Sequence, residues 1–174
     1  MKTALFAKSS TSRFVLFYLL LSGIGLTLLD VFAPATVIAQ FCLLLAHISG
    51  GVIHWFDPNV LVIGDVLRLP DSGFALRVSG ECTALQFTVL LVAGMLAFPA
   101  TWKIKLLGIV GGILALQALN IIRLISLLYL GQWYPAEFDW VHHHLWPIFF
   151  SIDLGLLFFG WIWWSSMKTT DNIL

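Results

Sequence analysis

Residues 104–130 read IKLLGIVGGILALQALNIIRLISLLYL, and this run alone predicts a membrane helix. It contains only two charged side chains, Lys105 and Arg123. A helix that crosses the hydrocarbon core of a bilayer needs about 20 mostly apolar residues. The run exceeds that length, so we expect a transmembrane helix that tilts or extends beyond the lipid.

The composition of the whole chain agrees with a lipid environment. Of the 174 residues, 60% are hydrophobic and 10% are charged, and the mean hydropathy is +0.96. Soluble domains are about half apolar and about a quarter charged, so lipid must be the solvent for much of this chain. The formal net charge of zero argues against a nucleic-acid partner. We therefore predict an all-α integral membrane protein that forms one polytopic domain over residues 1–174.

Further apolar runs predict four to five transmembrane helices in total. The expected helices cover about residues 14–32, 35–56, 82–98, 104–130 and 144–164. The run 35–56 has polar residues in its second half, so we expect a partial or interfacial helix there. Tryptophans end the last run, as they do in the aromatic belt of a membrane interface.

Residues 60–78 follow a different pattern, rich in β-formers on both sides of the sequence Pro70-Asp71-Ser72-Gly73. A turn sequence between two strand-like runs is typical of a β-hairpin. We therefore expect a short extracytoplasmic β-hairpin that lies on the membrane surface.

The distribution of Lys and Arg predicts the orientation in the membrane. Basic residues without neighbouring acids occur near the N-terminus and after the third apolar run, namely Lys2, Lys8, Arg13, Lys103 and Lys105, and Lys168 follows the last run. Acidic residues predominate in residues 57–81 and 131–141. The positive-inside rule places the basic regions in the cytoplasm and the acidic regions outside.

This orientation does not allow three crossings between the N-terminus and Lys103, because two cytoplasmic positions are separated by an even number of crossings. We expect residues 35–56 to enter the membrane without crossing it. Two other interpretations stay open. The N-terminus could lie outside, or a signal peptide could be removed, since Ala33-Pro34-Ala35 resembles a cleavage site.

Three reactive types of side chain meet at the outer face in this topology. Cys82 lies where the third apolar run enters the membrane from outside, and Arg123 lies in the outer part of the next helix. The last run begins with His142, His143 and His144. A nucleophile, a cation and a base from three separate segments are therefore expected on one surface.

Arg123 needs a reason to be in a membrane helix. An arginine inside a span costs about 2.5–3.5 kcal/mol on insertion scales. Snorkelling to the outer headgroups is one explanation. Asn120 and Gln117 lie on or near the same helical face, and a polar stripe favours a face that is turned toward protein.

Cys82 is the candidate nucleophile. Backbone N–H groups at a helix start stabilise a thiolate, and a nearby Arg or protonated His adds to this effect. Gln86 lies one turn further along on the same side and is a candidate supporting residue. Cys42 is surrounded by leucines and alanines, so we expect it to pack in the core.

One of the three adjacent histidines is expected to act, and the others are expected to be interfacial. Neighbouring residues of a helix point about 100° apart, so three adjacent histidines are poorly placed to bind a metal. We predict neither a metal nor a cofactor. Asp153, near the middle of the last run, is either a functional candidate or a helix contact.

A cysteine with a histidine base and a cationic arginine is a constellation for acyl transfer. The thiolate attacks a peptide carbonyl, and the arginine donates hydrogen bonds to the oxyanion. The histidine transfers protons to the leaving amine and from the incoming nucleophile.

The chain resembles the exosortase/archaeosortase family in three ordered motifs. They are SGECTAL at residues 79–85, LNIIR at 119–123, and FDWVH at 138–142 followed by Trp146. The resemblance covers about residues 60–164, and the chain looks most like the compact group called exosortase H. By position, Cys82 matches the family nucleophile and Arg123 the family arginine. His142 matches the family histidine, with His143 and His144 as alternatives.

The resemblance implies a membrane-embedded cysteine protease or transpeptidase in the cytoplasmic (inner) membrane, with its active site facing the outer side. Such enzymes act on C-terminal sorting signals of the PEP-CTERM type through a thioester acyl-enzyme. The implied partners are therefore membrane lipid and exported proteins that end in a short motif, an apolar helix and a basic tail. The acceptor of the acyl group, water or a surface polymer, stays open.

Two other classes of function remain as alternatives. In the first, the chain is a non-enzymatic membrane subunit or scaffold in which Arg123 and Asp153 are helix contacts. In the second, the histidines form a quinone or haem site, which requires paired histidines at matching depth on facing helices.

Overall fold

The computed structural model describes the backbone of residues 2–171 and the side chains of residues 11–167. Four of its helices are long and apolar enough to cross a membrane, namely Thr11–Phe32, Ala35–Ile53, Trp102–Trp133 and Phe138–Met167. A shorter apolar helix covers Leu85–Ala97. The prediction of an all-α membrane protein with four to five apolar helices and a small β element is confirmed.

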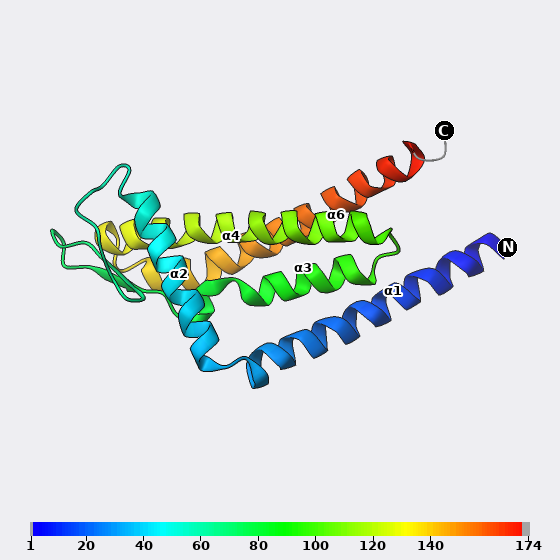
Figure 1. Cartoon of the computed structure of the whole chain (residues 1–174), viewed down its shortest axis with the longest axis horizontal. Coiled ribbons are helices and arrows are strands. Elements are labelled where there is room, and N and C mark those ends of the chain that lie inside the picture. Colours follow the sequence, from blue (N-terminus) through cyan, green and yellow to red (C-terminus); the bar gives the residue numbers. More distant parts are fainter. Residues whose placement is uncertain (1, 172–174) are drawn as a thin grey trace. The chain divides into compact units, whose positions relative to one another are not determined.

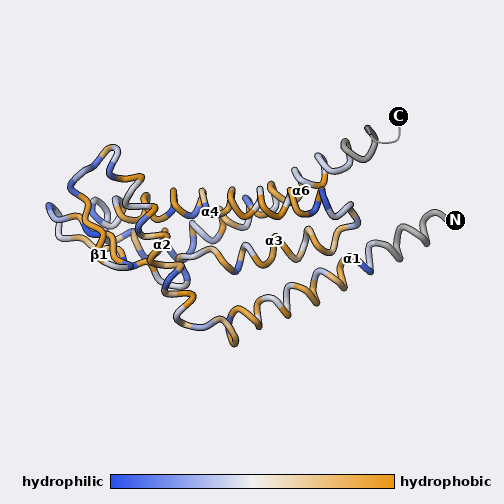
Figure 2. Tube along the Cα trace, viewed as in Figure 1, coloured by the Kyte–Doolittle hydropathy of each residue, from blue (hydrophilic) through white to orange (hydrophobic). Residues whose placement is uncertain are grey.

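The chain begins with helix α1 (Lys2–Thr27), the π-helical turn η1 (Leu28–Phe32) and helix α2 (Ala35–Ile53) (Figure 1). Three short strands and a 3-10 turn follow, namely β1 (Leu61–Ile63), β2 (Val66–Arg68), β3 (Ala75–Arg77) and η2 (Gly80–Thr83). The rest is helical, with α3 (Leu85–Ala97), α4 (Trp102–Trp133), α5 (Phe138–Trp140), the π-helical turn η3 (Val141–Leu145) and α6 (Trp146–Asp171). Hydrophobic residues run along α1, α3, α4 and α6, and hydrophilic residues gather in the loops near β1 (Figure 2).

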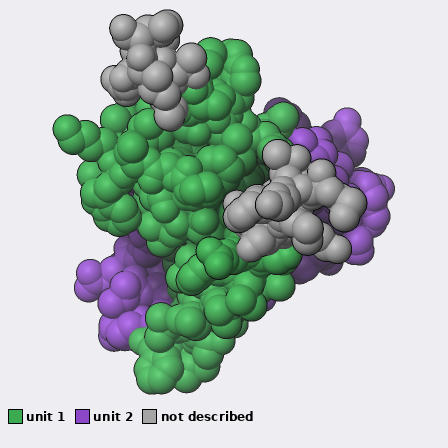
Figure 3. Space-filling view, turned by 90° about the vertical axis from the view of Figure 1, so that its right-hand side faces the viewer, with its two compact units in different colours: residues 1–32, 85–114, 153–174 green, residues 33–84, 115–152 purple. Residues whose placement is uncertain are grey.

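The chain forms two compact units (Figure 3). Unit 1 contains residues 1–32, 85–114 and 153–174, and unit 2 contains residues 33–84 and 115–152. Helices α4 and α6 each contribute to both units, because each is much longer than a single packed layer. Every residue that the sequence places in the acyl-transfer constellation belongs to unit 2.

Unit 1 is a packing of apolar helices. Helix α1 lies against α3, and Gly25 permits this approach because a side chain there would overlap Val89. The Phe14 ring lies 6.3 Å from Phe98 and 6.2 Å from Phe158, measured between ring centroids. These contacts depend on close packing of apolar side chains. In a bilayer the lipid tails are as apolar as the helices, so van der Waals packing of this kind drives helix association.

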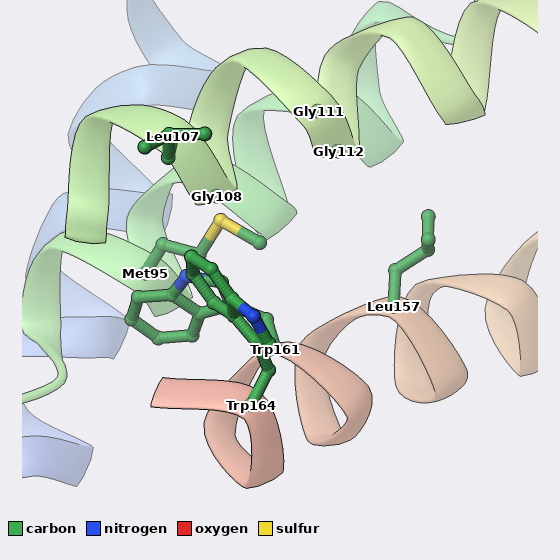
Figure 4. Close-up of a pocket in the computed structure, with 8 residues that line it drawn as sticks. All are labelled: Met95, Leu107, Gly108, Gly111, Gly112, Leu157, Trp161 and Trp164. Atoms are coloured by element: carbon green, nitrogen blue, oxygen red, sulfur yellow. The ribbon is translucent and has the colours of Figure 1, made fainter. Parts of the chain in front are cut away.

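Helices α4 and α6 meet in unit 1 at a tryptophan. The Trp161 ring lies against Gly108, and its Nε1 donates a hydrogen bond to the Ile104 carbonyl at 3.2 Å. Beside it is an apolar cavity of about 280 Å³, lined also by Gly111, Gly112, Met95 and Trp164 (Figure 4).

Unit 2 contains a three-stranded antiparallel sheet in the order β1-β2-β3. The predicted hairpin is the pair β2–β3, with Leu67 opposite Leu76 and residues 70–73 in the turn. Strand β1 extends this hairpin, because Gly64 takes a positive φ of 62° and reverses the chain between β1 and β2. The side chains of Leu67 and Leu76 are buried, whereas their neighbours along each strand are more exposed.

Helix α2 packs along β1, β2 and η2. Near its C-terminal end, a side chain at Gly50 would overlap Val62, and near its N-terminal end Ile38 lies 3.4 Å from where a side chain at Gly80 would begin. In Figure 1, α2 runs at a steep angle to the C-terminal half of α4. The helix therefore contacts the sheet layer over most of its length.

The core of unit 2 lies where this helix, the sheet and α4 meet. Helix α2 contributes Cys42, and the predicted core packing of this cysteine agrees with its burial. The other buried members come from the sheet layer and α4, including Leu67, Leu76, Val78, Leu124, Leu127 and Leu128. Cys82 belongs to the same cluster, so the candidate nucleophile is anchored in the most tightly packed part of the unit.

Candidate active site

Cys82 lies in the 3-10 turn η2 and not in the first turn of α3, where the sequence predicted it. Ser79 enters the turn in an extended conformation, and Ala84 leaves it in the left-handed conformation with φ of 55°. The left-handed residue separates the turn from α3, which begins at Leu85. A non-glycine residue in this conformation costs about 1–3 kcal/mol, and such residues concentrate at functional sites.

The Cys82 sulfur faces a histidine. Its Sγ lies 3.6 Å from Nε2 of His142, which is hydrogen-bonding distance for sulfur. The Ser79 hydroxyl donates a hydrogen bond to the same sulfur at 3.7 Å. Cys82 is only 2% exposed, so both neighbours act on a sulfur that is largely withdrawn from solvent.

A stack of aromatic rings positions His142. The His142 ring lies 5.7 Å from the ring of Phe138, one turn earlier, at an interplanar angle of 24°. Phe138 in turn makes an edge contact at 5.7 Å with Phe74, which follows the β2–β3 turn. Phe74 occupies the space that a side chain at Gly131 would need. The sheet and the C-terminal part of α4 therefore support the histidine from behind.

Neither of the other two histidines of the triplet is hydrogen-bonded to Cys82, although the His143 ring meets the His142 ring edge-on at 4.6 Å between centroids. His143 makes a hydrogen bond through Nδ1 to the Asp139 carbonyl at 2.9 Å, and His144 stacks on Trp140 at 6.0 Å. Both side chains are exposed. Of the three candidates, the structure brings His142 to Cys82.

Arg123 is buried beside this pair. Its side chain is 5% exposed, and its guanidinium carbon lies 5.6 Å from the centre of the Phe150 ring. Cys82 and Glu81 lie within range of a direct electrostatic interaction with it. The Arg123 Nε has no hydrogen-bond partner among the described residues. A buried donor without an acceptor is costly, so the Nε donor is available for an oxygen that a ligand brings.

Two amide side chains of α4 hold the nucleophile turn. Asn120, fully buried, donates from Nδ2 to the Cys82 carbonyl at 2.8 Å. Gln117 donates from Nε2 to the Thr83 carbonyl at 3.2 Å. These bonds attach η2 to the helix that carries Arg123, so the polar stripe predicted on this helix is turned toward protein.

The remaining sequence candidates lie outside this arrangement of contacts. Gln86 is exposed and hydrogen-bonds to none of the described residues. Asp153 is half-buried, and it has neither an ion pair nor a hydrogen bond in the described part of the chain. Among residues 11–167 no group of three or more His, Cys, Asp or Glu side chains is arranged to hold a metal ion.

Sequence reasoning did not assign roles to Ser79, Phe74 or Gly131. Ser79 precedes Cys82 by three residues, a spacing at which a turn can bring a hydroxyl to a thiol. Phe74 and Gly131 carry no such local signal, because their contact joins segments far apart in the sequence.

The fold and the site define a polytopic membrane protein in which a buried cysteine, paired with a half-buried histidine, adjoins a buried arginine. Residues 3–164 match the family model described as transmembrane exosortase, which is most of the chain. The chain belongs to the transmembrane exosortase family, as its sequence motifs indicated. No curated protein and no solved structure shows significant similarity to it.

Proposed function

We propose that this protein is a membrane-embedded cysteine protease or transpeptidase that cleaves C-terminal sorting signals of exported proteins. Membership of the exosortase family supports a role of this kind. The observation that carries the proposal is the 3.6 Å contact between Cys82 Sγ and His142 Nε2. A thiol and an imidazole at this distance can exchange a proton, which is the first requirement of a cysteine nucleophile.

The acylation step uses both side chains. His142 takes the thiol proton, and the Cys82 sulfur attacks the scissile carbonyl carbon to form a tetrahedral oxyanion. As this intermediate collapses, the carbon–nitrogen bond breaks and His142 gives its proton to the leaving amine. The products are the released C-terminal segment and a thioester between the exported protein and Cys82.

Deacylation reverses the proton movements. An acceptor, either water or a nucleophilic group of a surface polymer, gives a proton to His142 and attacks the thioester carbon. The carbon–sulfur bond then breaks, and the sulfur recovers the proton from His142. Hydrolysis and transpeptidation differ only in the acceptor.

Arg123 supplies the electrostatic part of the mechanism. Its unpartnered Nε donor is available to the oxyanion that forms in each step. Because the side chain is buried, little water competes for this donor, and oxyanion donors are worth more in such a site than in water.

The length of α4 supports a site at the outer boundary of the bilayer. Helix α4 begins at Trp102, beside the basic residues predicted to face the cytoplasm. At 1.5 Å per residue, Arg123 lies about 32 Å further along, and the hydrocarbon core is about 30 Å thick. We accordingly assign the protein to the cytoplasmic membrane with its active site facing outward, where an exported substrate anchored by an apolar helix and a basic tail can reach it.

The test compares the two cysteines of the chain. Cys82→Ala should abolish conversion of an exported precursor to its shortened product, while membrane insertion and protein abundance stay normal. Cys42→Ala is the matched control, because Cys42 is the other buried cysteine and packs in the core. The measurement is the precursor-to-product ratio in cells. Wild-type processing by Cys82→Ala would show that the cysteine mechanism is wrong.

A further inference from the structure

Strand β3 is an edge of the sheet and has only one strand neighbour. The order β1-β2-β3 pairs β3 with β2 on one side. Antiparallel ladders alternate between residues that exchange hydrogen bonds with the neighbouring strand and residues that do not. Which residues of β3 face outward can therefore be read from its hydrogen bonds.

One backbone hydrogen bond marks each end of the β2–β3 ladder. At one end the Leu69 N–H donates to the Phe74 carbonyl at 2.9 Å, and at the other the Val78 N–H donates to the Asp65 carbonyl at 2.8 Å. Alternation from these two pairs places Ala75 and Arg77 at the positions that do not bond to β2.

Their N–H and C=O groups therefore point away from the sheet. Both residues are exposed, and neither backbone is hydrogen-bonded to any other segment of the described chain.

The free edge leads directly to the nucleophile. After Arg77 and the buried Val78, the exposed residues Ser79, Gly80 and Glu81 lead to Cys82. Ser79 is still extended, with φ of −96° and ψ of 173°. A segment that paired with β3 would therefore run along the surface toward the sulfur and would present its backbone carbonyls there.

We propose that β3 is the docking strand for the substrate, which adds to the sheet as an extended segment beside Ala75 and Arg77. This inference rests on the proposed function and names the substrate-binding part of the same site. Addition of a strand to a sheet edge is a common way to bind peptides. Hydrogen bonds to the peptide backbone give the affinity, and nearby pockets for side chains give the specificity. The strand is short and carries a charged residue, so it does not invite association between copies of the chain.

The geometry also limits the length of the recognised segment. Two extended steps and three 3-10 steps separate Arg77 from Cys82, which is at most about 13 Å. An extended peptide covers that distance with about four residues. The recognised motif therefore consists of no more than about four residues next to the scissile bond, and it binds in an extended conformation.

The first test is crosslinking, and it does not depend on cleavage. In a Cys42→Ala/Cys82→Ser background, single cysteines replace Ala75 or Arg77, and a control cysteine replaces Leu61 on the opposite edge strand. The probe is an exported reporter that ends in a sorting signal from the same genome. Six versions of the reporter each carry a single cysteine, at one of the six positions before its apolar helix. A short bis-maleimide should join the reporter to positions 75 and 77 at alternate reporter residues, because side chains of a strand alternate between two faces. Position 61 should give only background.

The second test places the change in the reporter and leaves the enzyme unaltered. Proline removes a backbone N–H, whereas alanine at the same position keeps it. Proline at alternate motif positions should lower kcat/KM about three- to tenfold relative to alanine, which is the usual value of one backbone hydrogen bond. Crosslinking without a period of two, or equal effects of proline at consecutive positions, would overturn the docking strand. Processing of the reporter by Cys82→Ser would instead overturn the proposed catalytic mechanism.

Discussion

At the scale of single residues, a substitution of Arg123 distinguishes the enzyme hypothesis from the scaffold hypothesis. Its guanidinium is buried against Phe150 and has an unpartnered donor. Arg123→Lys keeps the charge but loses the planar fork that can hold an oxyanion. We expect this variant to lose about 10²–10³ in processing rate, the usual effect of removing an oxyanion donor. The measurement is precursor-to-product ratio beside protein abundance.

The scaffold alternative makes the opposite prediction for the same residue. Lysine also snorkels, so Arg123→Lys should be nearly silent if the arginine acts only through packing or headgroup contact. Arg123→Ala should then reduce abundance. Full activity of Arg123→Lys would remove the reason to place Arg123 in the active site.

The three adjacent histidines provide an internal comparison. His142→Ala should reduce processing by about 10²–10⁴, because a general acid–base group typically contributes that much. His143→Ala and His144→Ala should stay within a few-fold of wild type, since their side chains are exposed and neither is hydrogen-bonded to Cys82. Equal losses in all three variants, measured on precursor conversion at matched abundance, would contradict the assignment of His142.

At the scale of secondary-structure elements, the β2–β3 hairpin is a support for the histidine. Gly131→Ala would push Phe74 out of its place, since the added carbon overlaps the ring. Overpacking of this kind costs about 1–3 kcal/mol. We expect a lower melting temperature and slower processing, because Phe74 supports Phe138 and thereby His142.

Gly111→Ala is the matched control in the same helix. A side chain there meets nothing within 4 Å, and alanine favours helix by up to about 1 kcal/mol over glycine. This variant should therefore melt at the same or a higher temperature. Combining Gly131→Ala with Phe74→Leu should restore part of the lost stability by making room. No change in either readout for Gly131→Ala would mean that the ring stack does not support the site.

At the scale of the whole molecule, the path of α2 decides how often the chain crosses the bilayer. Helix α2 is long and apolar enough to cross, yet it contacts the sheet layer near both ends. Ile38 and Gly50 are about 18 Å apart along the helix axis. If the sheet lies outside, as its acidic charge predicts, we expect α2 to lie along the outer surface and not to cross. The N-terminus and Lys103 then share the cytoplasmic side.

Cysteine labelling tests this topology. Single cysteines replace Leu5, Arg77, Lys103 or Glu137 in a chain that lacks Cys42 and Cys82, and intact cells are treated with a membrane-impermeant maleimide. We expect positions 77 and 137 to label, and positions 5 and 103 to stay protected until the cells are permeabilised. Labelling at 5 together with protection at 103 would mean that α2 crosses the membrane.

The sequence by itself determined the class of environment and the family. Charged residues are too few to cover a water-facing surface, so lipid and apolar helices follow from composition alone. The motifs around Cys82, Arg123 and His142 also indicated the exosortase family, and the family match agrees with that indication. Local periodicity is sufficient for these conclusions because span length and motif spacing are properties of neighbouring residues.

Only the tertiary structure decided which side chains meet. Neighbouring residues on a helix point about 100° apart, so the choice of His142 depends on how η3 is rotated against its neighbours. Phe74 sets that rotation through Phe138, and Phe74 comes from a hairpin distant in the sequence. The hydrogen bond from Asn120 to the Cys82 carbonyl likewise joins segments far apart in the sequence. Such contacts leave no periodic signal, because the free energy that selects them arises only when the segments are packed together.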